Sequence, residues 1–225
     1  MQTRKQQVDS RKYSLILASA SPRRKELLSW LEIPFAIIPT EIEERSNFKR
    51  PSKVVVDLAR QKGLATYQLL QKREDFSKSF FPVVVAADTI VVNGSKILGK
   101  PKNSKAAAAM LRQLSGKEHR VLTGVYIGIF DKDRQLYHED FFCSTSKVTF
   151  LPLTEDILRR YLNSNDALDK AGAYGIQGPA LTFISKVDGS YSNVVGFPLS
   201  DFILHLKRNL GYTRDRIGRW RELFG

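Results

Sequence analysis

The stretch VVVAADTIVVNGSKILGKP, residues 83–101, decides the predicted fold class. Its first part is an uninterrupted apolar run, which is typical of a strand buried in the middle of a sheet. Asn93-Gly94 then predicts a tight hairpin turn between the segments TIVV and KIL. Hairpin partners are antiparallel, whereas long buried apolar strands are typical of parallel sheets, so the stretch predicts a mixed sheet.

Strand-like and helix-like segments are interspersed on both sides of this stretch. Further strands are predicted at 13–18, 35–40, 119–130 and 136–150, with a strand-and-turn segment over 181–197. Helices are predicted at 21–31, 51–72, 103–116, 154–164 and 198–210, with Ser104 and Thr154 as candidate caps. This mixture favours an α/β or an α+β fold around a mixed sheet. We predict the α/β class, as a single domain with two lobes around a mixed β-sheet.

The composition is that of an ordinary soluble globular protein, with 42% hydrophobic and 26% charged residues in a chain of 225. No apolar run approaches the roughly 18 residues that span a membrane, and the basic start has too short an apolar segment for a secretory signal. We therefore expect a cytoplasmic protein. The single cysteine, Cys143, excludes an intramolecular disulfide, and the three distant histidines give no zinc spacing.

The formal charge of +13 is spread unevenly, and about half of the excess lies in residues 1–12 and 207–225. Such a charge favours either anionic small molecules or nucleic acid as partners. The predicted organisation is a flexible basic leader (1–12), a central domain (13–209) and a basic C-terminal extension (210–225).

The stretch LASASPRRKELL, residues 17–28, places two arginines where a helix begins. Ser21 is the predicted N-cap, and a proline follows it as the first helical residue. Arg23 and Arg24 then fall in the first turn, where the helix dipole favours anions over cations. Together with Ser19 and free backbone N–H groups they form a candidate phosphate cradle, which predicts that neither arginine stabilises the ligand-free fold. The alternative is that both side chains extend into water.

Two acidic segments supply candidate catalytic or metal-binding carboxylates. Asp88 and Thr89 follow the apolar run of the central strand, and open sheets place ligands at strand ends. Asp88 can activate a water or bind a metal there, unless it only caps its own turn. The segment TEIEER holds Glu44, an oxygen donor of the kind that magnesium prefers, although an acidic run is often only a solvated loop.

Two glycine-containing segments supply candidate ligand-binding groups. GSKILGKP, residues 94–101, nearly matches a P-loop, but a proline stands where the metal-binding hydroxyl is required, so we reject that motif and keep Lys100 as a phosphate contact. LDKAGAYGIQG, residues 168–178, holds Asp169 and Lys170 among glycines that let backbone approach a ligand closely. Gln177 has both a donor and an acceptor for a nucleobase edge. The alternative for this segment is a plain connecting loop.

Seven motifs in a fixed order over residues 15–199 resemble the Maf family of nucleoside triphosphate pyrophosphatases. They are LASASPRRKELL, IEE, LARQKG, ADTIVVNGSKILGKP, LSGKEHRVLTGV, DKAGAYGIQG and GSYSNVVGFPL. The resemblance implies a two-lobed fold around an elongated mixed sheet, similar to inosine-triphosphate pyrophosphatases, with the site in the cleft. It also implies hydrolysis of a nucleoside triphosphate to the monophosphate and pyrophosphate with a divalent metal, Mg or Mn.

The resemblance also assigns roles to individual residues. It implies that Asp88 is the general base and, with Glu44, a metal ligand. Residues linked to substrate choice are Arg23, Thr89 and Gln177. Residues expected around the substrate phosphates are Ser19, Arg24, Lys62 and Lys100. Asp169 and Lys170 are further candidate substrate-binding residues on the basis of the segment 168–178 itself.

The DKAGAYGIQG motif resembles the subgroup that acts on dTTP and UTP. A second subgroup, which acts on 7-methyl-GTP, has serine, phenylalanine and glutamate where this chain has Ala173, Tyr174 and Gln177. A glutamate accepts hydrogen bonds from guanine, whereas Gln177 can both donate and accept, as uracil and thymine require.

The competing hypothesis is a basic, non-enzymatic binding protein that acts on the cell-division machinery or nucleic acid. The charged ends of the chain favour it, but no nucleic-acid motif is present and the aromatic residues do not interleave with the basic ones. The expected partner is therefore a nucleotide substrate, with no membrane or nucleic acid, and a homodimer is left open.

Overall fold

The computed structural model describes residues 12–73, 80–131, 133, 135–211 and 220–225. Within these ranges one seven-stranded sheet has the order β2-β1-β3-β5-β6-β7, and β4 pairs with β3. Its strands are β1 (Tyr13–Leu17), β2 (Phe35–Ile37), β3 (Phe81–Asn93), β4 (Lys96–Leu98), β5 (Glu118–Phe130), β6 (Leu136–Phe150) and β7 (Ile184–Asp188). The predicted α/β class is confirmed.

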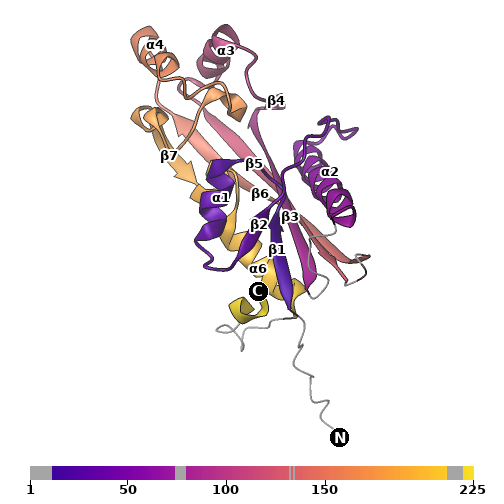
Figure 1. The fold of residues 1–225 in the computed structure, drawn as a ribbon. Helices are drawn as coiled ribbons and strands as arrows, with labels where there is room; N and C mark the ends of the chain where they lie inside the picture. Colours follow the sequence, from indigo (N-terminus) through magenta and orange to yellow (C-terminus); the bar gives the residue numbers. More distant parts are fainter. Residues whose placement is uncertain (1–11, 74–79, 132, 134, 212–219) are drawn as a thin grey trace, which may run out of the picture.

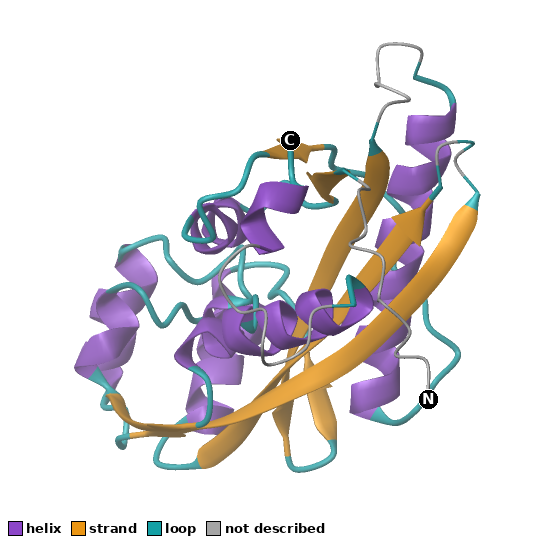
Figure 2. Cartoon of the chain, turned by 90° about the horizontal axis from the view of Figure 1, so that it is seen from below, coloured by secondary structure: helices purple, strands orange, loops and turns teal. Residues whose placement is uncertain are grey.

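Helices cover both faces of this sheet, as Figure 2 shows. They are α1 (Pro22–Ser29), α2 (Pro51–Gln71), α3 (Ser104–Leu114), α4 (Glu155–Asn163), α5 (Tyr191–Val195) and α6 (Leu199–Asn209). In Figure 1, α2 lies apart from α1 and α6, while α3 and α4 lie together at one end of the sheet. Within the described ranges, no helix combines the length and the apolar character needed to cross a bilayer.

The sheet is mixed, as the hairpin signal predicts. β1 runs parallel to β2 and β3, and β3 runs antiparallel to β4 and β5. The β3–β4 hairpin turns at Gly94, whose φ of 59° is the left-handed conformation that such turns require. One expectation is wrong: Asp88 does not end its strand, because β3 continues to Asn93. The parallel β1–β3 ladder ends at Val85, so Asp88 lies just beyond the carboxyl end of the parallel part.

Two lobes share the long strands β3, β5 and β6. In the first lobe, alternate residues of β1 face different helices: Leu15 packs with the α1 and α6 side chains, and Ile16 packs with those of α2. In the second lobe, Val91 and Val121 continue β3 and β5 into a separate apolar cluster with α3 and α4. The cleft between the lobes therefore lies across the middle of the sheet.

The end of the chain belongs to the core of the first lobe. Trp220 is only 2% exposed and packs in the same cluster as the β1 and α6 side chains. Phe224 pairs in parallel with Tyr13 of β1, and Arg221 Nε donates to the Leu31 carbonyl at 2.8 Å. The last six residues of the predicted extension are thus part of the domain's packing, while residues 1–11 of the predicted leader 1–12 and residues 212–219 lie outside the described ranges.

Two local expectations need correction. The N-cap of α3 is Asn103 and not Ser104, because the Asn103 side chain accepts from the Ala106 N–H at 2.9 Å. Residues 191–195 form the short helix α5 and not part of a strand-and-turn segment, since the Ser190 side chain caps them by accepting from the Asn193 N–H. The expected cap Thr154 is confirmed, because its hydroxyl accepts from the Ile157 N–H.

Gly124 of β5 allows α2 to lie directly against the sheet. A Cβ atom at this position would collide with the Val55 backbone of α2. Gly124 is the register partner of Asp88 on β3, so α2 crosses the sheet at the level of this aspartate. The close approach is what brings the polar residues of α2 within reach of β3.

We expect Gly124→Ala to lower the free energy of unfolding by about 1–3 kcal/mol, the usual cost of overpacking a well-packed interface. Urea unfolding measures this change. The control is Gly99→Ala, where an added methyl group meets open space. Equal stability of the two variants would contradict the close packing of α2.

The second lobe contains one buried imidazole that makes stability depend on pH. Burial lowers the pKa of His119 from 6.5 to about 4. The unfolded chain therefore binds this proton below pH 6.5, whereas the folded chain binds it only below about pH 4. The contribution to stability is complete above pH 6.5 and is lost as the pH falls through about 4.

We expect the unfolding free energy contributed by His119 to fall by about 2 kcal/mol between pH 7 and pH 5. Urea unfolding at both pH values measures the fall. In His119→Gln the new side chain does not titrate, so the free energy of unfolding should fall by about 2 kcal/mol less between pH 7 and pH 5 than in the wild type. An unchanged pH dependence in the folded variant would contradict the assignment.

Candidate active site

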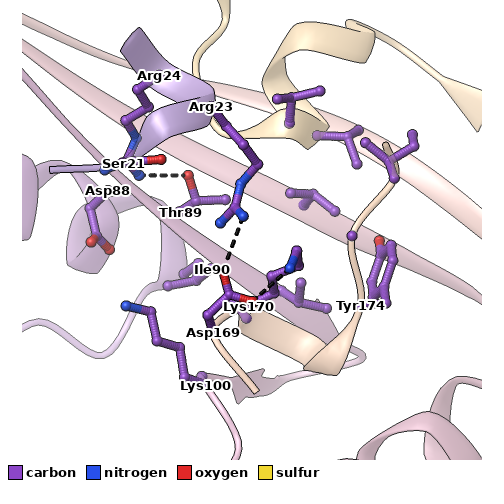
Figure 3. A pocket seen from close by; sticks show the side chains of 18 of the residues that line it. Ser21, Arg23, Arg24, Asp88, Thr89, Ile90, Lys100, Asp169, Lys170 and Tyr174 are labelled. Atoms are coloured by element: carbon purple, nitrogen blue, oxygen red, sulfur yellow. Dashed lines mark hydrogen bonds and ion pairs between the residues drawn. The ribbon is translucent and has the colours of Figure 1, made fainter. Parts of the chain in front are cut away.

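A cavity of about 730 Å³ lies in the cleft and collects nearly all the predicted site residues. This volume is in the range of pockets that bind a nucleotide-sized ligand. Figure 3 labels several of them, namely Arg23, Arg24, Asp88, Thr89, Lys100, Asp169 and Lys170. Of the predicted residues, Ser19 alone does not line it. The lining includes Arg23, Arg24, Glu44, Lys62, Asp88, Thr89, Lys100, Asp169, Lys170 and Gln177.

Lys62 of α2 bridges the two carboxylates that the sequence pairs as metal ligands. Its Nζ lies 2.5 Å from Asp88 Oδ1 and 2.8 Å from Glu44 Oε1. The Lys62 side chain is 14% exposed and that of Asp88 10%, while Glu44 is half exposed. The ion pair therefore fixes the Asp88 carboxylate at the cavity wall, at the level where α2 crosses β3.

Arg24 is held by three hydrogen bonds to the protein. Its Nε donates to the Gly196 carbonyl at 2.9 Å, and its two terminal nitrogens donate to the hydroxyls of Ser19 and Thr89, each at 3.2 Å. Burial lowers the pKa of Arg24, while the nearby Asp88 opposes that shift. None of the three partners is charged, so the positive charge of Arg24 remains available to an anionic ligand.

Arg23 belongs to an ion-pair network that crosses the cleft. Its Nη1 lies 3.1 Å from Asp169 Oδ2, and the other Asp169 oxygen lies 2.6 Å from Lys170 Nζ. Lys170 also pairs with Asp166 at 2.8 Å, and Asp166 accepts from the Tyr161 hydroxyl. Burial raises the pKa of Asp169, but hydrogen bonds from Lys170 and Arg23 outweigh it, so the pKa lies below its usual value.

Lys100 and Gln177 face the cavity without partners among the described residues. Lys100 is exposed and extends into the cavity from the side opposite Arg24, as Figure 3 shows. Gln177 is exposed on the loop that follows the short 3₁₀ turn Ala171–Ala173. Both side chains are therefore free to contact a ligand, one as a cation and the other as a donor and acceptor.

The cavity as a whole is rich in charge of both signs. Five cationic side chains line it together with four carboxylates, namely Glu44, Asp88, Asp166 and Asp169. Such a site binds a polyanion with the cations and places a carboxylate beside it.

Asp88 and Glu44 converge on one position, and both offer the hard oxygen donors that a divalent cation prefers. Among the described residues no group of three or more His, Cys, Asp and Glu side chains gathers to hold a metal ion. Magnesium sites that act on phosphates use one or two carboxylates and complete their shell with water and phosphate oxygens, so the pair fits that class.

The sequence did not indicate the groups that hydrogen-bond the cavity-lining side chains and hold them in place. The Thr89 hydroxyl lies 3.1 Å from that of Thr123, which donates to the carbonyl of the fully buried Asn193. Asp166 was also missed, as was the Gly196 carbonyl. The sequence signal that could have pointed to Asn193 and Gly196 is the motif GSYSNVVGFPL, which contains both. Its residue types alone indicate no role for them.

The chain is similar in sequence to a known protein family and to proteins with assigned names. The family model for Maf-like proteins matches residues 14–209. A protein named dTTP/UTP pyrophosphatase from Bacillus velezensis is 43% identical over 194 residues, which cover 86% of this chain and 95% of that protein. Another of that name from Bacillus thuringiensis subsp. konkukian is 44% identical over 195 residues, covering 86% and 94%. With the family model spanning most of its length, this chain belongs to the Maf-like protein family.

Proposed function

We propose that this chain hydrolyses dTTP, UTP and related pyrimidine nucleoside triphosphates to the monophosphate and pyrophosphate. The observation that carries the proposal is the placement of the Asp88 carboxylate in a cavity lined by five cations, with the exposed Gln177 also in its lining. The relatives named dTTP/UTP pyrophosphatase support the choice of nucleotides.

In this reaction water cleaves the anhydride bond between the α- and β-phosphates. Arg24 and Lys100 hold the phosphates from opposite sides of the cavity and offset the charge that moves onto the leaving pyrophosphate. Asp88, oriented by its ion pair with Lys62, accepts the proton that water loses. The triphosphate offers oxygens to Arg23 and Lys62 in exchange for part of their contact with Asp169 and Glu44.

Asp88 and Glu44 would hold the divalent cation, Mg or Mn, that we propose as cofactor. When bound, such an ion neutralises phosphate charge. Gln177 would read the base, since its carboxamide matches the alternating donor and acceptor atoms of uracil and thymine. We propose the cytoplasm as the compartment, consistent with a single cysteine.

The competing hypothesis of a non-enzymatic basic protein is not favoured. It leaves unexplained why Asp88 is buried and held by Lys62 inside the cavity, since binding alone needs no ordered carboxylate beside an anion.

Pyrophosphate release from a panel of dTTP, UTP, CTP, dATP, GTP and 7-methyl-GTP, with Mg²⁺ or Mn²⁺, tests the proposal. We expect the highest kcat/KM for dTTP and UTP. A folded wild-type chain that releases no pyrophosphate from any of them would refute the enzymatic function.

The two arginines should differ in what they contribute to the ligand-free protein. Arg24→Ala removes three hydrogen bonds to the protein and should lower the unfolding free energy by about 1–3 kcal/mol. Arg23→Ala removes one solvent-exposed ion pair and should cost at most about 1 kcal/mol. The structure thus gives Arg24 a stabilising role that the sequence did not predict.

Both variants should nevertheless lose affinity for nucleotide by about ten- to a hundredfold, because each lacks a charge-assisted phosphate contact. Thermal melts with and without a nonhydrolysable dTTP analogue measure the two effects separately. Ligand-induced stabilisation equal to that of the wild type would exclude the phosphate cradle.

A further inference from the structure

A buried imidazole–phenol pair joins β5 to the segment that carries Gln177, and its phenol, Tyr174, lines the cavity. His119 Nε2 of β5 is 2.8 Å from the Tyr174 hydroxyl, and the two residues are 2% and 5% exposed. The rings meet edge to face at 5.4 Å, and each also meets the Phe150 ring edge to face at 4.8 Å. This is a polar contact inside an apolar cluster, where its geometry is well defined.

The backbone before Tyr174 is in a conformation that needs an anchor. Gly172 has a φ of 70°, and Ala173, which has a Cβ, has a φ of 64°. The left-handed conformation is unfavourable for alanine and persists only where the surroundings hold it. Gly172 N–H donates to the Gly99 carbonyl at 3.1 Å, and a Cβ at Gly172 would press on Val91 of β3.

The backbone after Tyr174 is held from a second side. The Gly175 N–H donates to the Tyr161 hydroxyl at 3.2 Å, and this hydroxyl in turn donates to Asp166. The segment 174–177 is therefore held at two points: the Tyr174 hydroxyl contacts His119, and the Gly175 N–H bonds the Tyr161 hydroxyl. Tyr174 itself lines the cavity. Gln177 lies three residues beyond Tyr174, so its position depends on where Tyr174 is fixed.

We infer that His119 is a positioning residue for base selection: its bond to Tyr174 sets the place from which Gln177 meets the nucleobase. The inference rests on the proposed function for its choice of ligand. His119 is buried and, unlike Tyr174, is not in the lining of the cavity, so it acts through Tyr174. The Tyr174 ring packs on Phe150 with or without the hydroxyl, so the bond and the packing can be separated by mutation.

Three variants test the inference. Tyr174→Phe and His119→Leu each remove the bond and retain an apolar side chain in the cluster. His119→Gln is the rescue variant, because its terminal amide can replace Nε2 as partner of the Tyr174 hydroxyl. Leu158→Ala, in the same cluster on α4, is the control for simple loss of stability.

The measurement is the ratio of Kd values for nonhydrolysable UTP and GTP analogues, obtained by titration calorimetry on folded protein. We expect the preference for the uridine analogue to fall at least fivefold in Tyr174→Phe and His119→Leu. It should return to within twofold of wild type in His119→Gln and stay unchanged in Leu158→Ala. Combining Tyr174→Phe with His119→Leu should add no further loss, since both remove one bond.

An unchanged ratio in the first two folded variants, or an equal fall in Leu158→Ala, would overturn the inference. So would a wild-type chain that binds both analogues equally. The proposed function is judged separately, because a wild type that discriminates between the analogues but hydrolyses neither nucleotide would refute hydrolysis alone.

Discussion

Asp88→Asn lowers kcat for dTTP and UTP by on the order of 10² or more, the effect expected when a general base is lost. Asparagine keeps the shape of the side chain but neither accepts the proton nor carries the charge that pairs with Lys62. Steady-state pyrophosphate release on the folded variant measures the loss.

The matched control for this change is Asp156→Asn on α4. Asp156 is a solvent-exposed carboxylate paired with Arg159 and Arg160 outside the cavity lining. The Asp156→Asn variant should retain the wild-type kcat for dTTP and UTP. A kcat within a few-fold of wild type in folded Asp88→Asn would remove this residue from the mechanism.

Trp220→Ala lowers the free energy of unfolding by about 3–5 kcal/mol, as expected for truncating a fully buried aromatic side chain. Trp220 fills the core of the first lobe and lies under two cations, with Lys207 Nζ 5.4 Å and the Arg221 guanidinium 5.2 Å from its ring. Urea unfolding with a second probe, such as far-UV circular dichroism, is required because the variant loses a fluorophore.

The control for the terminal segment, residues 220–225, is Arg221→Ala, which removes one hydrogen bond to the Leu31 carbonyl and one cation–π contact with Trp220. It should cost about 1–2 kcal/mol. If Trp220→Ala is no more destabilising than Arg221→Ala, the terminal segment does not contribute to the core. The packing of Trp220 and Phe224 predicts that deletion of residues 213–225 unfolds the domain. If the terminal segment does not contribute to the core, the same deletion leaves the domain folded.

Much of the fold follows from local sequence signals. The apolar run at 83–87 and the Asn93-Gly94 turn are short-range features, and they predict the mixed sheet because hairpin geometry depends on adjacent residues. Helix α5 could not be predicted in this way. It is only five residues long and contains tyrosine, asparagine and two valines, which are poor helix formers, and it becomes helical because the Ser190 cap and the burial of Asn193 outweigh their propensity.

The membership of the site was easier to predict than its internal pairing. Residue types and motifs indicate which side chains face a ligand, and ten of the predicted residues line one cavity. They do not show that Lys62 bridges Asp88 and Glu44, or that Arg23 reaches Asp169, because these contacts join residues far apart in the chain. The same holds for Trp220, since a basic sequence around it gives no sign of burial.

Because Lys62 and Arg23 are paired with carboxylates, the cavity discriminates between ligands by their number of negative charges. A ligand that takes these cations must offer more than the aspartate and glutamate oxygens that it displaces. A triphosphate carries about four negative charges spread over three centres and can compete at several points, whereas a monophosphate carries about two at one centre. For the proposed reaction, we therefore expect the internal ion pairs to re-form as pyrophosphate and then the monophosphate leave the cavity, because the monophosphate alone competes with them at one centre only.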